Sequence, residues 1–271
     1  MSILLAERPR VDTSLTGIVN YIEPGRTKPY VRFRYDVGTS ETNAIYTPHR
    51  VSIADMRPIA DQLSLDVQGF ELIRHVTGAG DFETDEQVDI GKSEAIDIIK
   101  ARTGAREILV FDHTIRKHDS NAPRQPSTRV HNDYTATSAP ARVRDLLGAE
   151  ADAHLAKRVA FINLWRPIRV PAIDWPLALC DARSVRAEDF IATDILYPDR
   201  RGEIYGLAHL TRHRWFYAPA MSTSEALLIK NYDSRADVAR FAPHTAFENP
   251  HAPTNTPPRE SIEFRAIAFF D

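Results

Sequence analysis

Short apolar runs and polar turns alternate along the chain from Val159 to its end. The runs are rich in β-branched and aromatic residues, and no helical pattern separates them. This arrangement favours an antiparallel sandwich or barrel over alternating β–α units. The expected strands are Val159–Leu164, Leu177–Ser184, Glu203–Leu210, Arg214–Ala218, Ala226–Tyr232, Thr245–Phe247 and Ser261–Phe270.

The first half of the chain mixes strand and helix patterns. In chain order we predict a strand pair, Gly17–Ile22 and Tyr30–Tyr35, with a turn at Pro24–Gly25, helices at Val51–Leu63 and Gly91–Thr103, a strand at Ala105–Ile115 and a helical insertion at Ala139–Arg158. Ser93 is the expected cap of the second helix. The prediction is a β-rich α+β fold, in which residues 1–104 form an α/β region packing on a core of residues 105–271.

Composition is typical of a globular protein and excludes several classes of function. Apolar residues make up 43% of the chain and charged residues 26%, which is enough for a core and unlike a disordered segment. The formal net charge of -3 gives no basic surface for nucleic acid. With one cysteine no intrachain disulfide can form. There is no signal-peptide pattern or membrane-spanning run, so we expect a cytoplasmic protein with a small-molecule partner.

The triplet His131-Asn132-Asp133 is a candidate metal-binding motif. On a strand, residues two apart point to the same face, so both side chains can reach one ion. A distal histidine would complete a set of two histidines and one carboxylate, which is typical of non-haem iron(II) oxygenases and leaves positions open for a co-substrate and O2.

A second cluster near the C-terminus selects the third ligand. His244 precedes the pair Arg259 and Ser261, which share one side of the last predicted strand. A guanidinium can bind a carboxylate through two hydrogen bonds, and a serine hydroxyl adds another, so the pair suits a dicarboxylic co-substrate. The alternative is that the histidines cap loops and Arg259 forms an ordinary ion pair.

Further residues are secondary candidates. Asn163 and Trp165 alternate on a predicted strand and are candidates for substrate or co-substrate binding, while core packing of the indole is the alternative. Tyr217 is a candidate hydrogen-bond donor to the co-substrate. Arg265 lies six residues after Arg259, on the same strand face, and competes with it as the co-substrate anchor.

Several blocks in this order resemble the Fe(II)/2-oxoglutarate-dependent oxygenases, within the family grouped with gibberellin desaturase and the cephalosporin 7α-methoxylation protein. The blocks are VHNDYT from residue 130, FINLWRPI from 161, PLALCDARSV from 176, RWFYAPAM from 214, EALLIKNYDS from 225, PHTAFENP from 243 and PRESIEFRA from 258. They span roughly residues 105–271, with weaker matching upstream.

This resemblance implies a double-stranded β-helix core of the jelly-roll or cupin type. It implies iron ligation by His131, Asp133 and His244 and binding of the 2-oxoglutarate C5 carboxylate by Arg259 and Ser261. The implied reaction consumes 2-oxoglutarate and O2, releases succinate and CO2, and hydroxylates or desaturates a natural-product-like small molecule. The alternatives are a cupin-type metalloenzyme with redox-neutral chemistry, such as an isomerase or hydrolase, and a non-catalytic binding module. The substrate and the oligomeric state are not predicted.

Overall fold

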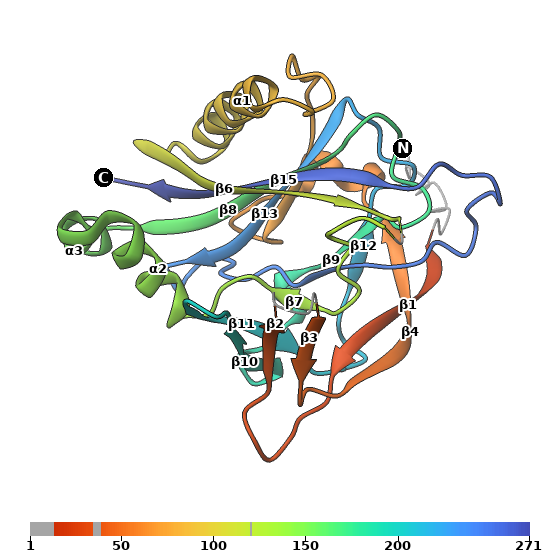
Figure 1. The fold of residues 1–271 in the computed structure, drawn as a ribbon, viewed down its shortest axis with the longest axis horizontal. Helices are drawn as coiled ribbons and strands as arrows, with labels where there is room; N and C mark the ends of the chain where they lie inside the picture. Colours follow the sequence, from red (N-terminus) through yellow and green to blue (C-terminus); the bar gives the residue numbers. More distant parts are fainter. Residues whose placement is uncertain (1–13, 35–38, 120) are drawn as a thin grey trace, which may run out of the picture.

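Two β-sheets form most of the molecule in the computed structural model, which describes residues 14–34, 39–119 and 121–271 (Figure 1). Within these residues the larger sheet has ten strands, in the order β1-β4-β12-β9-β14-β7-β11-β10-β2-β3. Their bounds are β1 (Leu15–Ile22), β2 (Tyr30–Arg34), β3 (Thr39–Thr42), β4 (Tyr46–Asp55), β7 (His131–Asn132), β9 (Leu177–Cys180), β10 (Phe190–Leu196), β11 (Arg201–Leu207), β12 (Trp215–Tyr217) and β14 (His244–Ala246).

The smaller sheet is antiparallel throughout, with the strand order β5-β13-β8-β15-β6. Its strands are β5 (Phe70–Arg74), β6 (Glu107–Lys117), β8 (Val159–Pro167), β13 (Glu225–Asp233) and β15 (Glu260–Phe269). Side chains on β15 alternate between two faces: Ile262 and Phe264 belong to an apolar cluster, whereas Ser261 and Glu263 line a cavity. One face of this sheet therefore builds the core, and the other faces a polar site.

Helix α1 (Asp85–Thr103) covers the apolar face of the smaller sheet (Figure 1). Thr84 caps its start in a capping box with Gln87, and Gly104 ends it in the left-handed conformation, with φ 68°. A Cβ added at Gly91 would lie 2.7 Å from the ring of Phe264, so glycine permits the close approach of helix and sheet.

The helical insertion lies between β7 and β8. It consists of α2 (Ser138–Leu147), η2 (Gly148–Glu150) and α3 (Ala151–Leu155), and its apolar side packs on Phe161 and Phe269. The remaining short helices are η1 (Arg57–Gln62), η3 (Ala182–Ser184) and η4 (Ala187–Asp189). Among the residues described, no helix is long and apolar enough to cross a membrane.

Two bulges interrupt the smaller sheet. On β13 the register with β8 shifts between Lys230 and Tyr232, which leaves Asn231 unpaired. On β6 the register with β15 passes from Asp112 to Val110, which leaves Phe111 unpaired. A bulge redirects the side chain of the extra residue, and both of these residues contribute to the sites described below.

The β-rich α+β character and the helical insertion are confirmed, but the predicted N-terminal strand pair is wrong. β1 pairs with β4, and β2 pairs with β3 and, in parallel, with β10. Tyr35, at the end of that prediction, lies outside the described residues. The Pro24–Gly25 turn signal therefore belongs to a longer connection, because proline and glycine mark a chain reversal without fixing which strands pair.

The predicted helix Val51–Leu63 is also wrong. Its first half is strand β4, and Pro58 lies in the first turn of the short helix η1. β-Branched residues favour a strand here, and a proline cannot continue an α-helix from the residues before it. The cap predicted at Ser93 is wrong as well, since α1 begins earlier in the chain. Strand β10 was not predicted.

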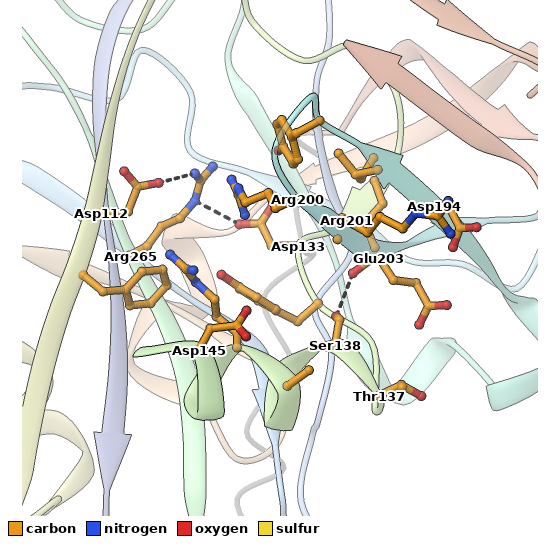
Figure 2. A pocket seen from close by; sticks show the side chains of 18 residues that line it. Asp112, Asp133, Thr137, Ser138, Asp145, Asp194, Arg200, Arg201, Glu203 and Arg265 are labelled. Atoms are coloured by element: carbon orange, nitrogen blue, oxygen red, sulfur yellow. Dashed lines mark hydrogen bonds and ion pairs between the residues drawn. The ribbon is translucent and has the colours of Figure 1, made fainter. Parts of the chain in front are cut away.

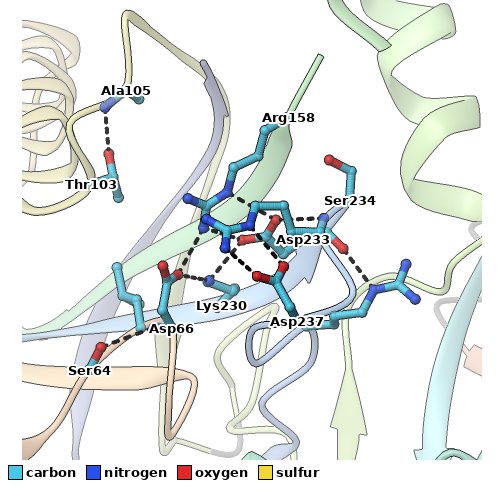
Figure 3. A network of polar contacts seen from close by, with 12 residues as sticks. Ser64, Asp66, Thr103, Ala105, Arg158, Lys230, Asp233, Ser234 and Asp237 are labelled. Atoms are coloured by element: carbon cyan, nitrogen blue, oxygen red, sulfur yellow. Dashed lines mark hydrogen bonds and ion pairs between the residues drawn. The ribbon is translucent and has the colours of Figure 1, made fainter. Parts of the chain in front are cut away.

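A buried network of charges ties β13 to the neighbouring loop and β8 (Figure 3). The Lys230 ammonium, 1% exposed, lies 2.8 Å from the carboxylate of Asp233, which is fully buried. Arg158 bridges Asp233 and Asp66 at 2.7 and 2.8 Å, and Lys230 also pairs with Asp66. Because each buried charge has an opposite partner, the network holds the strand that carries the Asn231 bulge.

Replacing Lys230 tests this role. We expect Lys230→Met to lower the free energy of unfolding by about 3 kcal/mol, because it leaves the buried Asp233 carboxylate with Arg158 as its remaining cation. Lys92→Met is the control: Lys92 forms an exposed pair with Asp89, and its loss should cost less than about 1 kcal/mol. Denaturant unfolding measures both. Equal stability of the two variants would contradict the assigned role.

Candidate metal centre

His131, Asp133 and His244 converge between the two sheets. Their ligand atoms lie within 4.8 Å of one another, so the three side chains could hold one metal ion. His131 and His244 occupy opposed positions on the neighbouring strands β7 and β14, with ring centroids 4.5 Å apart. Asp133 follows β7 directly, and its Oδ1 is 3.6 Å from Nε2 of His131. The pairing of β7 with β14 and the two-residue spacing of His131 and Asp133 thus bring the three side chains together.

Backbone carbonyls orient both imidazoles. Nδ1 of His131 lies 2.8 Å from the carbonyl oxygen of Arg129, and Nδ1 of His244 lies 3.1 Å from that of Ala242. In each ring a proton on Nδ1 donates this hydrogen bond, which leaves Nε2 as the free lone pair for a metal. Burial, with the neighbouring His244, lowers the pKa of His131 to about 4, so this ligand is neutral at pH 7.

The Asp133 carboxylate is ionised although its side chain is only 13% exposed. Burial alone would raise its pKa, but the charge of Arg265 holds the pKa below its usual value. Asn163 contributes by donating a hydrogen bond of 2.7 Å to Oδ2. Nε of Arg265 lies 3.5 Å from the same oxygen. A carboxylate beside two imidazoles is a donor set that suits a divalent iron.

Two asparagine side chains fix the backbone around the ligands. Asn231, the bulge residue of β13, accepts a hydrogen bond of 3.1 Å from the Asp133 N–H. Asn132, fully buried between the two ligands of its strand, donates to the Asn231 carbonyl at 2.8 Å and accepts from the N–H of Ala242 at 3.1 Å. The carbonyl of Ala242 in turn orients His244. The side chains of Asn132 and Asn231, here called the amide pair, therefore connect the backbone segments that carry all three ligands.

A narrow cavity adjoins the two histidine ligands and contains the predicted anchor. It is lined by Thr114, Arg116, Ser127, His131, Trp165, Leu177, His244, Ala246, Arg259, Ser261, Glu263 and Arg265. The structure therefore brings together the two histidines, Arg259, Ser261 and Trp165. Asn163 lies beside them through its hydrogen bond to Asp133.

The Arg259 guanidinium is buried and has no carboxylate partner in the described part of the chain. It lies over the ring of Trp165, 5.4 Å from the centroid, and Nη1 donates to the Trp175 carbonyl at 2.7 Å. Nε is buried without a hydrogen-bond partner. Burial, with the charge of Arg116, lowers its pKa to about 9, still above neutrality. A buried cation with an unused donor fits the carboxylate of a ligand.

The other predicted residues are placed differently. Tyr217, on β12, packs edge-on against Phe247 with centroids 5.6 Å apart and is absent from the residues that line this cavity. Arg265 reaches the cavity but pairs with Asp112 and Glu263, both at 2.9 Å, so its charge is already matched. Sequence reasoning missed Asn132 and Asn231. The position of Asn132 between two ligands was a usable signal, whereas nothing local marked Asn231.

Known proteins are similar to this chain in both sequence and fold. A family model described as an oxidoreductase/YMDC permease-like domain matches residues 19–269. A hydroxylase/desaturase of Hormonema carpetanum is 31% identical over 95% of this chain and 98% of its own. The Fe(II)/2-oxoglutarate-dependent dioxygenase nvfI of Aspergillus novofumigatus is 29% identical over 89% of this chain and 90% of its own.

A solved structure of the iron and alpha-ketoglutarate-dependent endoperoxidase NvfI superposes with a TM-score of 0.87 at 28% identity, covering 95% of this chain and 98% of that one. The chain belongs to the Fe(II)/2-oxoglutarate-dependent dioxygenases. Membership in this dioxygenase family agrees with the resemblance inferred from the sequence and favours it over redox-neutral cupin chemistry.

The amide pair gives a prediction for this dioxygenase. We expect Asn231→Ala to weaken Fe(II) binding by about 10–100-fold, because the Asp133 backbone loses the acceptor that positions it. Asn43→Ala removes an exposed amide far along the sequence and is the control. Anaerobic chelator competition measures the affinity, and thermal unfolding checks that both variants are folded. Iron affinity equal to that of the control would contradict the positioning role.

Proposed function

We propose that His131, Asp133 and His244 bind Fe(II), and that the adjoining narrow cavity binds 2-oxoglutarate. The enzyme is then a dioxygenase that hydroxylates or desaturates a small, natural-product-like molecule. The observation that carries the proposal is the buried, carboxylate-free guanidinium of Arg259 in a cavity shared with the two histidines. A redox-neutral metalloenzyme would not need this cation.

The protein residues hold and separate the reactants. The two imidazoles and the Asp133 carboxylate would hold the metal, and a set of three protein ligands would leave coordination positions for a co-substrate. Arg259 binds the C5 carboxylate of 2-oxoglutarate, and Ser261, 1% exposed, adds its hydroxyl. Trp165 and Leu177 supply apolar walls that exclude water. Bound there, Fe(II) with 2-oxoglutarate and O2 supplies the oxidising power for an unactivated C–H bond, with release of succinate and CO2.

We also propose that the two facing sheets are the double-stranded β-helix of this enzyme class, with residues 105–271 as its core and residues 1–104 packed on it. Two facts support this division. The strands that carry the proposed metal and 2-oxoglutarate residues all lie after residue 105, and the earlier strands lie at the ends of both sheets. The cytoplasmic location expected from the sequence remains a prediction.

Iron occupancy tests the ligand assignment. The purified enzyme with Fe(II), ascorbate and 2-oxoglutarate should form succinate in an O2-dependent reaction. His131→Ala and Asp133→Ala should lose at least about tenfold in iron affinity, because each removes one of three protein ligands. His113→Ala, on the exposed side of β6, is the control and should keep its iron. Metal analysis after desalting gives the result. Full occupancy in either ligand variant would refute the assignment.

Arg259 is tested separately by co-substrate binding. Arg259→Gln should weaken 2-oxoglutarate binding by about 10–100-fold, the loss expected for a charge-assisted hydrogen bond of roughly 1.5–3 kcal/mol. Iron affinity should not change, because Arg259 is not a ligand. Arg106→Gln, which alters an exposed pair with Glu107, is the matched control. Anaerobic calorimetry measures both affinities. Unchanged 2-oxoglutarate binding would contradict the anchor, and Arg265→Gln would then be the next variant to measure.

A further inference from the structure

A second, larger cavity meets the metal centre at Asp133, which is one of its lining residues (Figure 2). It has a volume of about 360 Å³ and lies among β6, the segment from β7 to α2, and the connection between β10 and β11. Asp133 lines this cavity, and Arg265 lies on the boundary, since it lines the narrow cavity as well. A molecule in the larger cavity therefore reaches the metal ligand without occupying the site of Arg259.

The charges around this cavity are unequally matched. Arg265 pairs with Asp112 and Asp133, and Lys28 pairs with the cavity carboxylates Asp194 and Glu203. Three cavity arginines have no carboxylate partner among the described residues, and one cavity carboxylate has no cation. The three arginines are Arg142, Arg200 and Arg201, and the carboxylate is Asp145. With Lys28 included, the five carboxylates of the cavity are balanced by five cations, but Arg142, Arg200 and Arg201 form no ion pair with the described residues and are available to a ligand.

Aromatic rings hold two of these guanidiniums in place. Arg142, on α2, is half-buried and lies over the ring of Phe111 at 5.4 Å from the centroid. Arg200, in the β10–β11 connection, lies over Tyr197 at 4.1 Å. A guanidinium held over an aromatic ring by a cation–π contact can still donate its N–H groups to a second partner. Phe111 is the bulge residue of β6, so the bulge itself places the Arg142 platform in the cavity.

The lining also includes apolar side chains that suit the hydrocarbon part of an organic molecule. Phe111, Tyr134, Ile195 and Ile204 contribute side chains to the same cavity. A ligand that fits this wall therefore needs an apolar framework together with a group that accepts hydrogen bonds from arginine.

We propose that this cavity binds the substrate as an anion, an apolar organic molecule whose carboxylate is bound by Arg142, with Arg200 as a second donor. The proposal rests on the proposed function, because it places the oxidised C–H bond beside the metal held by Asp133. The charge of the substrate carboxylate replaces the partner that Arg142 lacks, and it orients the framework toward the metal.

The test uses a pair of probes that differ in charge. The anaerobic enzyme with Fe(II) and saturating 2-oxoglutarate, which occupies Arg259, is titrated with 2-naphthoate and with the neutral 2-naphthamide in equilibrium dialysis. We expect the carboxylate to bind at least about tenfold more tightly than the amide. Arg142→Gln should reduce this preference to about threefold or less. Arg144→Gln, on the same helix but outside the cavity lining, should keep it.

The outcomes separate this inference from the proposed function. Binding of 2-oxoglutarate is measured first in the same wild-type sample, and its failure would overturn both. If 2-oxoglutarate binds, but the wild-type enzyme shows no preference for naphthoate or binds neither probe, the anionic-substrate proposal alone is wrong. A preference that survives intact in Arg142→Gln, with thermal unfolding showing a folded variant, would also overturn it.

Discussion

The largely buried carboxylate of Asp133 is the constraint on which the centre of this molecule depends. Removing a carboxylate from water is costly unless charges and hydrogen bonds replace the water. Here Asn163 donates to it, Arg265 lies beside it, and Asn231 holds its backbone N–H. These partners come from three strands of the smaller sheet, whereas the neighbouring histidines come from the larger one. The two sheets must therefore pack in one arrangement for the charge to be stable.

Two irregularities in the smaller sheet place side chains at the metal centre and at the larger cavity. The bulge at Asn231 turns an amide toward the metal-binding segment, and the charge network around Lys230 holds that strand in place. The bulge at Phe111 turns a ring into the larger cavity, under Arg142. A regular β-ladder would direct neither side chain to these positions. The two bulges are therefore the features of the smaller sheet that position residues of the binding sites.

The sequence predicted the residues whose relation is local or periodic. His131 opens β7 and Asp133 directly follows it, while Arg259 directly precedes β15 and Ser261 lies within it, so both pairs keep the two-residue spacing by which a strand presents side chains on one face. The pairing of β1 with β4 did not follow, because a turn signal says that the chain reverses but not which strand it joins. The larger cavity could not be predicted from the sequence either, because its arginines come from separate segments that only the tertiary packing brings together.

The most direct test of the account is a crystal structure of the anaerobic enzyme with Fe(II) and 2-oxoglutarate, with iron located by its anomalous scattering. We predict one iron within bonding distance of Nε2 of His131, Nε2 of His244 and a carboxylate oxygen of Asp133. The C5 carboxylate of 2-oxoglutarate should contact the Arg259 guanidinium, and the larger cavity should remain free of it. Iron outside this group, or 2-oxoglutarate held by the arginines of the larger cavity, would contradict the account.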